Sequence, residues 1–123
     1  MNIHDFDAIR PFEPEELPAV FDRLMHNEQF LKVLDYLYPG VPTEAISKKM
    51  SQCKSNLDFQ KAFCYNFLVE LLAKASLGCD IDVRNIDLQK RHTFVSNHRD
   101  IVLDSALLHK LLIDSGSDTT TEI

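Results

Sequence analysis

Apolar residues recur at helical spacing through most of the first 78 residues of this chain. They fall three or four positions apart, which places them on one face of an α-helix, and that face must be covered by another element. Short loops separate the helical segments, and Pro39–Gly40 stops one of them. The pattern predicts a small bundle of four amphipathic helices. These helices are expected over about residues 13–25, 28–38, 43–50 and 55–77.

Polar residues mark the predicted helix starts. Asn27, Thr43 and Ser55 each stand where a side-chain oxygen can accept a hydrogen bond from the first helical amides. Asp58 follows Ser55 at the third helical position, as in a capping box. These signals set the expected helix boundaries within the bundle.

The pattern changes after Gly78. "CDIDVRNID" alternates apolar and polar residues, which is typical of a half-buried strand, and "HTFVSN" predicts a second strand. A helix from about Asp100 to Asp114 follows, and a third strand is expected to begin in "TTEI". The predicted fold class is therefore α+β, mostly α: a small helical bundle over residues 1–78, then the first β-β-α elements of an incomplete α/β domain over residues 79–123. The unpaired sheet edge would favour a homo-oligomer.

Composition and charge exclude several classes of protein. The formal net charge is −6, which argues against non-specific nucleic-acid binding because that requires a basic surface. No apolar run reaches the roughly 18–20 residues that span a bilayer. The N-terminus lacks the basic and apolar regions of a secretory signal. The chain is therefore expected in the cytoplasm, or bound peripherally to the inner face of the membrane.

The stretch "FVSNHRDIVLDSALL" enters an apolar helix through charged residues. His98 stands at the exit of a predicted strand, which is where α/β proteins place their chemistry. A histidine held by a carboxylate is a common general base for a hydroxyl, because the carboxylate fixes the ring tautomer and stabilises the imidazolium. Asp104 falls among apolar positions of the helix, where a carboxylate is costly to desolvate unless it is paired. Arg99 and the free amides of the helix start would favour a phosphate.

Each of these residues also has an ordinary structural interpretation. Asp100 is expected to be the N-cap of the helix rather than a catalytic residue. Asp104 can share a solvated stripe with Asp100, Lys110 and Asp114, and Arg99 can be surface charge. A histidine and an aspartate a few residues apart also occur by chance, so the spacing alone does not decide between a catalytic site and a strand-to-helix turn.

A metal site built from His92, His98 and Asp100 is a third interpretation. These residues lack the rest of a coordination shell, so the sequence predicts no metal. The three cysteines match no zinc spacing and are expected to be reduced thiols. They are Cys53, Cys64 and Cys79.

The longer string "FVSNHRDIVLDSALLHKLL" resembles the first conserved block of the glycerolipid acyltransferases, the lysophosphatidate acyltransferase-like superfamily. In that family an "NH" at the end of a strand is followed by an aspartate and an apolar helix. The family histidine is the general base that activates a glycerol hydroxyl against an acyl thioester, and the aspartate orients it. The resemblance assigns the base to His98 and implies substrate-binding roles for Asn97 and Arg99.

The resemblance matches the family aspartate to Asp104, because "LDSALL" continues as it does in the family. The usual pattern has four residues between the histidine and the aspartate, whereas five separate His98 from Asp104 and one separates it from Asp100. Asp100 therefore stays open as the other candidate partner. Upstream, "FLKVLDYLYPG" resembles the extension found in one bacterial branch of the family, so the similarity covers most of the chain.

This resemblance implies an enzyme that moves a fatty acyl group from acyl-CoA or acyl carrier protein to a glycerol-phosphate lipid, without a metal or redox cofactor. The family's later blocks, including a "PEG"-type phosphate-binding turn, do not occur in the chain. The 123 residues are therefore expected to be the N-terminal part of a longer enzyme and inactive alone. The alternative is a helical interaction module without catalysis, in which "NHRD" is an ordinary turn before a helix.

Overall fold

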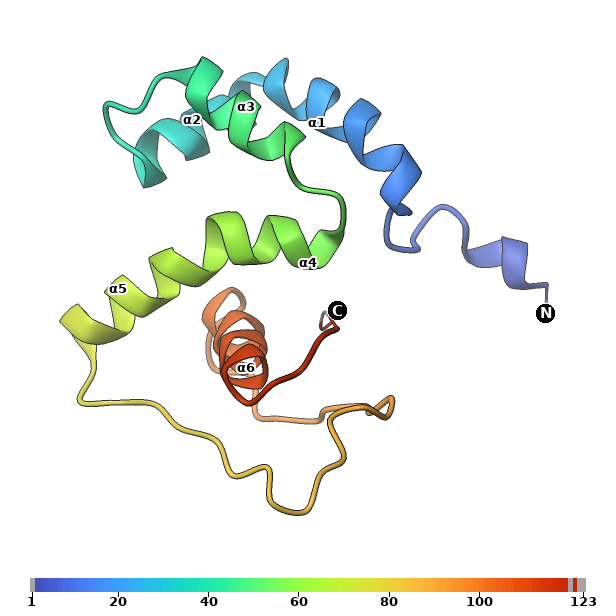
Figure 1. Ribbon diagram of the computed structural model, residues 1–123, viewed down its shortest axis with the longest axis vertical. Coiled ribbons are helices and arrows are strands. Elements are labelled where there is room, and N and C mark those ends of the chain that lie inside the picture. The colour runs from blue at the N-terminus through green and yellow to red at the C-terminus, as the bar shows by residue number, and fades with distance from the viewer. Residues whose placement is uncertain (1, 120, 122–123) are drawn as a thin grey trace. The chain divides into compact units, whose positions relative to one another are not determined.

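The computed structural model describes residues 2–119 and 121, and the chain divides into two compact units. The first unit is Met1–Phe59 and the second is Gln60–Ile123. Within the described residues all regular structure is helical (Figure 1). The boundary predicted at residue 78, between a helical region and an acyltransferase domain, concerns the family's organisation and stays a prediction.

Three α-helices form the body of the first unit. α1 packs against both α2 and α3. The helices predicted over these three segments are confirmed. α1 begins four residues after the predicted start at residue 13, because the 3-10 helix η2 occupies Pro14–Glu16, and the other boundaries agree to within one residue. The elements of the unit are η1 (Ile3–Phe6), η2 (Pro14–Glu16), α1 (Leu17–Met25), α2 (Glu28–Leu37), α3 (Thr43–Ser51) and α4 (Asn56–Phe59).

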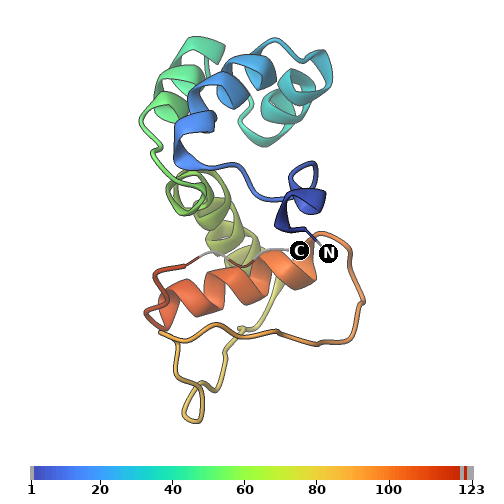
Figure 2. The ribbon, with the colours of Figure 1, turned by 90° about the vertical axis from the view of Figure 1, so that its right-hand side faces the viewer.

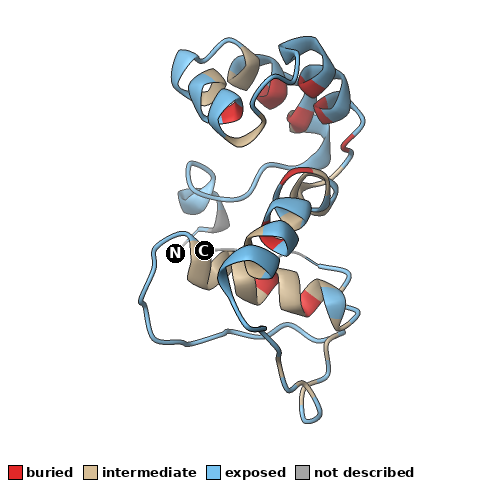
Figure 3. Cartoon of the chain, turned by 90° about the vertical axis from the view of Figure 1, so that its left-hand side faces the viewer, coloured by how far each residue is buried: buried red, intermediate tan, exposed pale blue. Residues whose placement is uncertain are grey.

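The core of the first unit forms where these helices face one another, as the buried positions in Figure 3 show. Met50 of α3 is only 1% exposed. Phe21 of α1 stacks on Phe59 of α4, with ring centroids 5.7 Å apart. Burying one such side chain contributes about 1.5–3 kcal/mol, so this core is the main source of the unit's stability. Its buried residues are Leu17, Val20, Phe21, Leu34, Ile46, Met50 and Cys53.

Two of the predicted helix caps are confirmed. The side-chain oxygen of Asn27 accepts a hydrogen bond from the amide of Phe30 at 3.0 Å, at the start of α2. The hydroxyl of Ser55 accepts one from the amide of Asp58 at 3.1 Å, at the start of α4. Each satisfies an amide that has no partner within the helix.

The cap predicted at Thr43 is wrong. Thr43 is the first residue of α3, and Pro42 precedes it as the N-cap without a side-chain hydrogen bond. Proline fixes its own φ and favours an extended conformation before the helix, so the chain can turn into α3 without a hydroxyl cap.

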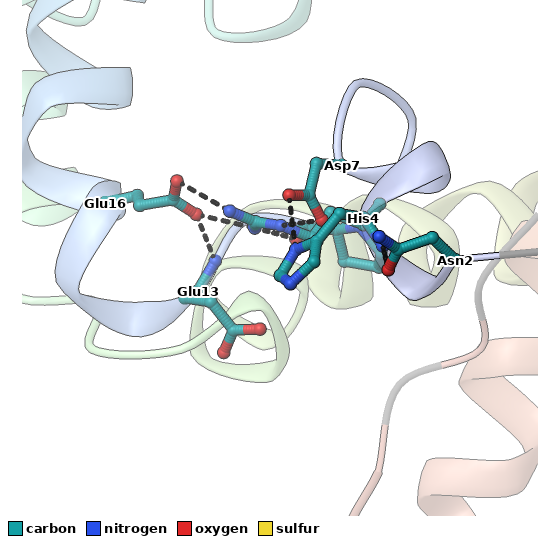
Figure 4. A network of polar contacts seen from close by, with 7 residues as sticks. Asn2, His4, Asp7, Glu13 and Glu16 are labelled. Atoms are coloured by element: carbon teal, nitrogen blue, oxygen red, sulfur yellow. Dashed lines mark hydrogen bonds and ion pairs between the residues drawn. The ribbon is translucent and has the colours of Figure 1, made fainter.

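A bidentate ion pair ties the N-terminal segment to Glu16, the last residue of η2 (Figure 4). The two terminal nitrogens of Arg10 donate to the two carboxylate oxygens of Glu16 at 2.8 and 3.0 Å. The same carboxylate accepts the backbone amide of Glu13 at 2.7 Å. The Arg10 guanidinium and the Glu13 amide together lower the pKa of Glu16 from 4.5 to about 2.

The second unit contains helices on either side of a long connection. Residues 76–102 join α5 to α6 without helix or strand, and Figure 2 shows this connection leaving the end of α5 and returning to the start of α6. The fourth predicted helix is interrupted, because its middle is π-helical, and it ends before Gly78. The elements of this unit are the π-helix η3 (Gln60–Tyr65), α5 (Asn66–Ala75) and α6 (Leu103–Asp114).

The prediction of an α+β fold class is wrong for the residues that the structure describes. "CDIDVRNID" and "HTFVSN" both lie in the connection and form no strand. Two backbone hydrogen bonds there close turns instead, from Ile86 to Val83 and from Lys90 to Asp87, each at 3.0 Å. A strand needs a neighbour to satisfy its amides and carbonyls, and an alternating pattern alone does not supply one. The third predicted strand, in "TTEI", lies outside the described residues except for Thr121, which is in no strand.

A small core and a polar clamp hold α6 within the second unit. The buried residues of this unit are Phe63, Leu68, His109 and Leu112. The Tyr65 hydroxyl donates to the carboxylate of Asp114, and Lys110 donates to the same carboxylate at 2.5 Å. The Lys110 ammonium also lies 5.6 Å from the centre of the Tyr65 ring. η3 and the C-terminal end of α6 are therefore joined by both charge and ring contacts.

The helices of the described residues fall short of the length and apolar character that a bilayer-spanning helix requires.

Candidate functional site

His98 and Asp104 lie together where the connection enters α6. The Nδ1 atom of His98 is 3.7 Å from the Oδ2 atom of Asp104. The His98 side chain is 70% exposed, whereas that of Asp104 is 28% exposed. The structure thus brings together the two residues to which the sequence assigns the base and its orienting carboxylate, and it leaves the histidine accessible to a substrate.

Backbone amides hold the Asp104 carboxylate in place. Its Oδ2 atom accepts the amide of Arg99 at 2.6 Å and that of Asp100 at 2.9 Å. The amides of Asp100 and Arg99, followed by the nearby charges of His98 and Arg99, lower the pKa of Asp104 against the opposing effect of burial. The carboxylate is therefore charged at neutral pH. Its position beside apolar residues is explained by these polar partners.

Asp100 performs a related task at the same turn. Its Oδ1 atom accepts the amides of Val102 at 2.9 Å and Leu103 at 2.8 Å. Both amides lower the pKa of Asp100, and the amide of Leu103 has the larger effect. The predicted helix start at Asp100 is early, because α6 begins at Leu103 and its N-cap is Val102. Asp100 therefore closes the turn that leads into α6, whereas the carboxylate that lies beside the His98 ring is that of Asp104.

Asn97 and Arg99 flank His98 in the exposed part of the connection. Arg99 is fixed through its backbone amide, which donates to Asp104. Their predicted roles in substrate binding stay predictions.

Apolar side chains next to these residues are open to solvent, a feature that sequence reasoning missed. Val95 is 93% exposed, Ile101 80% and Val102 65%. The apolar spacing predicts that the helix already begins at residue 101. Because α6 starts only at Leu103, the two residues before it lie outside the helix and outside its packed face.

This arrangement suits proton transfer from a hydroxyl. A carboxylate beside Nδ1 favours the neutral tautomer with its proton on that nitrogen, which leaves the Nε2 lone pair free to accept a proton. The 3.7 Å separation is longer than a hydrogen bond. Catalytic hydrogen bonds are often long in an enzyme without substrate and shorten when the substrate binds.

Metal and thiol chemistry find less support. Among the described residues, no three His, Cys, Asp or Glu side chains gather in an arrangement that could hold a metal ion. His92, considered above as a ligand, instead has its Nε2 atom 2.7 Å from the backbone oxygen of Asp87. Cys53, Cys64 and Cys79 are free thiols, and burial raises the pKa of the first two, which disfavours the reactive thiolate.

A buried histidine, His109 of α6, was not identified from the sequence. Its Nδ1 atom accepts the backbone amide of Thr121 at 3.3 Å, and its Nε2 atom is buried without a partner among the described residues. A histidine amid leucines on one helix was the only available signal. It marks a buried position and does not by itself indicate a site.

No family model, curated protein or solved structure matches the chain. The functional interpretation therefore rests on the geometry of His98 and Asp104, together with the residues of "FVSNHRDIVLDSALLHKLL".

Proposed function

We propose that this chain carries the general-base pair of a glycerolipid acyltransferase. The enzyme would move a fatty acyl group from acyl-CoA or acyl carrier protein to the hydroxyl of a glycerol-phosphate lipid. The observation that carries the proposal is the approach of His98 Nδ1 to within 3.7 Å of Asp104 Oδ2, with the histidine ring exposed.

In the proposed reaction, the acceptor hydroxyl oxygen attacks the carbonyl carbon of the thioester. The Nε2 atom of His98 takes the hydroxyl proton as the new carbon–oxygen bond forms, and Asp104 stabilises the resulting imidazolium. The carbon–sulfur bond then breaks, and the imidazolium returns the proton to the departing sulfur as a thiol. The chemistry balances without a metal or redox cofactor.

The charge near His98 favours an acceptor that carries a phosphate. Although the whole chain has a net charge of −6, residues 90–99 contain Lys90, Arg91 and Arg99 and no carboxylate. Among these cations, Arg99 is the one nearest to the base in sequence. We assign it the acceptor phosphate, because a guanidinium can bind phosphate oxygens in a bidentate manner.

The same surface supports a peripheral position on the inner face of the membrane, where a lipid acceptor would be met. Val95, Ile101 and Val102 are exposed apolar residues within four positions of Arg99 in the sequence. Such a pairing suits an interface between headgroups and acyl chains. Self-association through residues 79–123 stays a prediction.

The experiment uses the protein as its gene encodes it. It measures the transfer of a labelled acyl group to lysophosphatidate, first from acyl-CoA and then from acyl carrier protein. His98→Ala should lower the rate on the order of 10²–10⁴-fold, because a general base contributes about that much. Its melting temperature should stay unchanged because the side chain is mostly exposed. His92→Ala, an exposed histidine of the same connection, is the matched control and should retain activity.

A helical interaction module is the competing function, since the Asp104 carboxylate would hold the same two amides in a purely structural turn. Absence of turnover with both donors would reject the acyltransferase and leave the module, whereas full activity in His98→Ala would reject His98 as the general base.

A further inference from the structure

We infer that Asp100 is a positioning residue for His98, acting through a reciprocal brace with Asp104. The aspartate brace consists of these two carboxylates and the four backbone amides that they accept, those of Arg99, Asp100, Val102 and Leu103. The brace itself is defined by these hydrogen bonds, whereas its effect on catalysis rests on the proposed function.

The hydrogen bonds of the brace cross the turn in both directions. Asp104, inside α6, reaches back to the amides of Arg99 and Asp100, which directly follow His98. Asp100, before the helix, reaches forward to the amides of Val102 and Leu103. The backbone oxygen of Asp100 also accepts the amide of Asp104 at 3.3 Å. Asp104 therefore fixes the main chain before the turn, and Asp100 fixes the main chain after it.

His98 depends on this turn for its position. Its side chain is 70% exposed, and its main chain lies in the connection, outside any helix or strand. Packing therefore does little to restrain the ring. The brace holds the next two residues against α6, and this restraint places the ring beside the carboxylate of Asp104.

An ordinary helix cap would not have this effect. A cap satisfies the first helical amides and sets where the helix begins. Here the oxygen that faces His98, Oδ2 of Asp104, is the same oxygen that the amides of Arg99 and Asp100 hold. If the Asp100 side chain is removed, the turn loses two of its hydrogen bonds, and the main chain that carries the amides holding that oxygen is less restrained relative to α6.

The test records the ring nitrogens of His98 by ¹⁵N NMR at a pH where the ring is neutral. Wild type and Asp100→Asn should carry the proton mainly on Nδ1, because asparagine keeps a side-chain oxygen for both amides. In Asp100→Ala the Nδ1-protonated fraction should fall to that of an unrestrained histidine. Asp118→Ala, which removes an exposed aspartate from the same unit, is the matched control and should resemble wild type.

Steady-state kinetics on the same variants test whether the brace affects catalysis. Asp100→Ala should lower kcat on the order of 10²-fold with little change in KM, because the variant misplaces the general base but leaves substrate binding unchanged. Asp100→Asn should restore kcat. If the alanine variant keeps both the wild-type tautomer and the wild-type kcat, Asp100 does not position His98.

Hydrogen exchange in the wild-type protein tests the brace even if the alanine variant does not fold. The amides of Arg99 and Asp100 should exchange more slowly than those of Asn97 and His98, and equal rates would reject the brace. If the exchange and tautomer results hold but wild type transfers no acyl group, the brace stands and the proposed acyltransferase function fails. The two conclusions can therefore be rejected separately.

Discussion

At the scale of single residues, carboxylates in this protein are stabilised in their charged form by amides and cations. Asp100 and Asp104 each accept two amides, and Glu16 accepts one amide and a bidentate arginine. Hydrogen bonds to the charged form lower a carboxyl pKa. These groups therefore keep their charge, and with it their local structure, in more acidic solution than an ordinary carboxyl group.

Glu16 should titrate near pH 2, because the Arg10 guanidinium and the Glu13 amide both favour its charged form. Its folded pKa lies below the ordinary 4.5, so its contribution to stability is complete above pH 4.5 and is lost as the pH falls toward about 2. NMR of the side-chain carboxyl carbon measures the midpoint. Arg10→Gln should move the midpoint toward 4.5, and Arg91→Gln should not; a wild-type midpoint near 4.5 would exclude the bidentate pair.

His109 should make the fold sensitive to mild acid. Burial, followed by the nearby charge of Lys61, lowers its pKa from 6.5. Below about pH 6.5 the unfolded histidine takes up a proton more readily than the folded one, so stability should fall as the pH decreases through that range. Thermal melts between about pH 7.5 and pH 5 measure the effect. His109→Gln, which does not titrate, should show a smaller loss; identical losses would assign the acid sensitivity to other groups.

At the scale of elements, the first unit could be predicted because its signals are local. Apolar spacing gave α1, α2 and α3, and the caps at Asn27 and Ser55 follow from short-range hydrogen bonds. The connection could not be predicted in the same way, because a strand depends on a neighbour that the pattern does not specify. The π-helical form of η3 likewise has no local signal.

The candidate site could be predicted in part. The sequence identifies His98 and Asp104 as candidates, and the Nδ1 atom of His98 lies 3.7 Å from the Oδ2 atom of Asp104. The brace could not be predicted, because it depends on a turn of irregular backbone between Asp100 and Leu103, whereas the apolar spacing predicts helical geometry from Asp100 onward. Two aspartates four residues apart at a helix entry were the available signal.

Packing of α3 against α1 should depend strongly on Met50, which is 1% exposed. Met50→Ala should lower the free energy of unfolding of the first unit by about 2–5 kcal/mol, because it leaves a cavity in a packed core. Val33→Ala, at a position that is 52% exposed, should stay within about 0.5 kcal/mol of wild type. Chemical denaturation measures both. A small effect of Met50→Ala would show that the helices of this unit do not form a packed core.

At the scale of the whole molecule, charge is unevenly distributed. The chain is acidic, with a net charge of −6, yet the stretch that leads to His98 is basic. The proposed base, the cation assigned to the acceptor phosphate and the exposed apolar side chains all belong to this stretch or directly follow it. Electrostatic attraction of an anionic lipid toward an otherwise acidic protein would therefore be directed to the candidate site.

The central claim is that the Asp104 carboxylate orients His98 as a general base. The most direct measurement compares acyl-transfer rates and melting temperatures of Asp104→Asn and Asp100→Asn in the protein as its gene encodes it. Asp104→Asn should lose most activity at a near-normal melting temperature, because the amide keeps an acceptor for the turn but disturbs the histidine tautomer. Asp100→Asn should stay close to wild type. A severe kinetic loss in Asp100→Asn with a mild one in Asp104→Asn, or equal thermal destabilisation without a kinetic defect in either, would contradict the account.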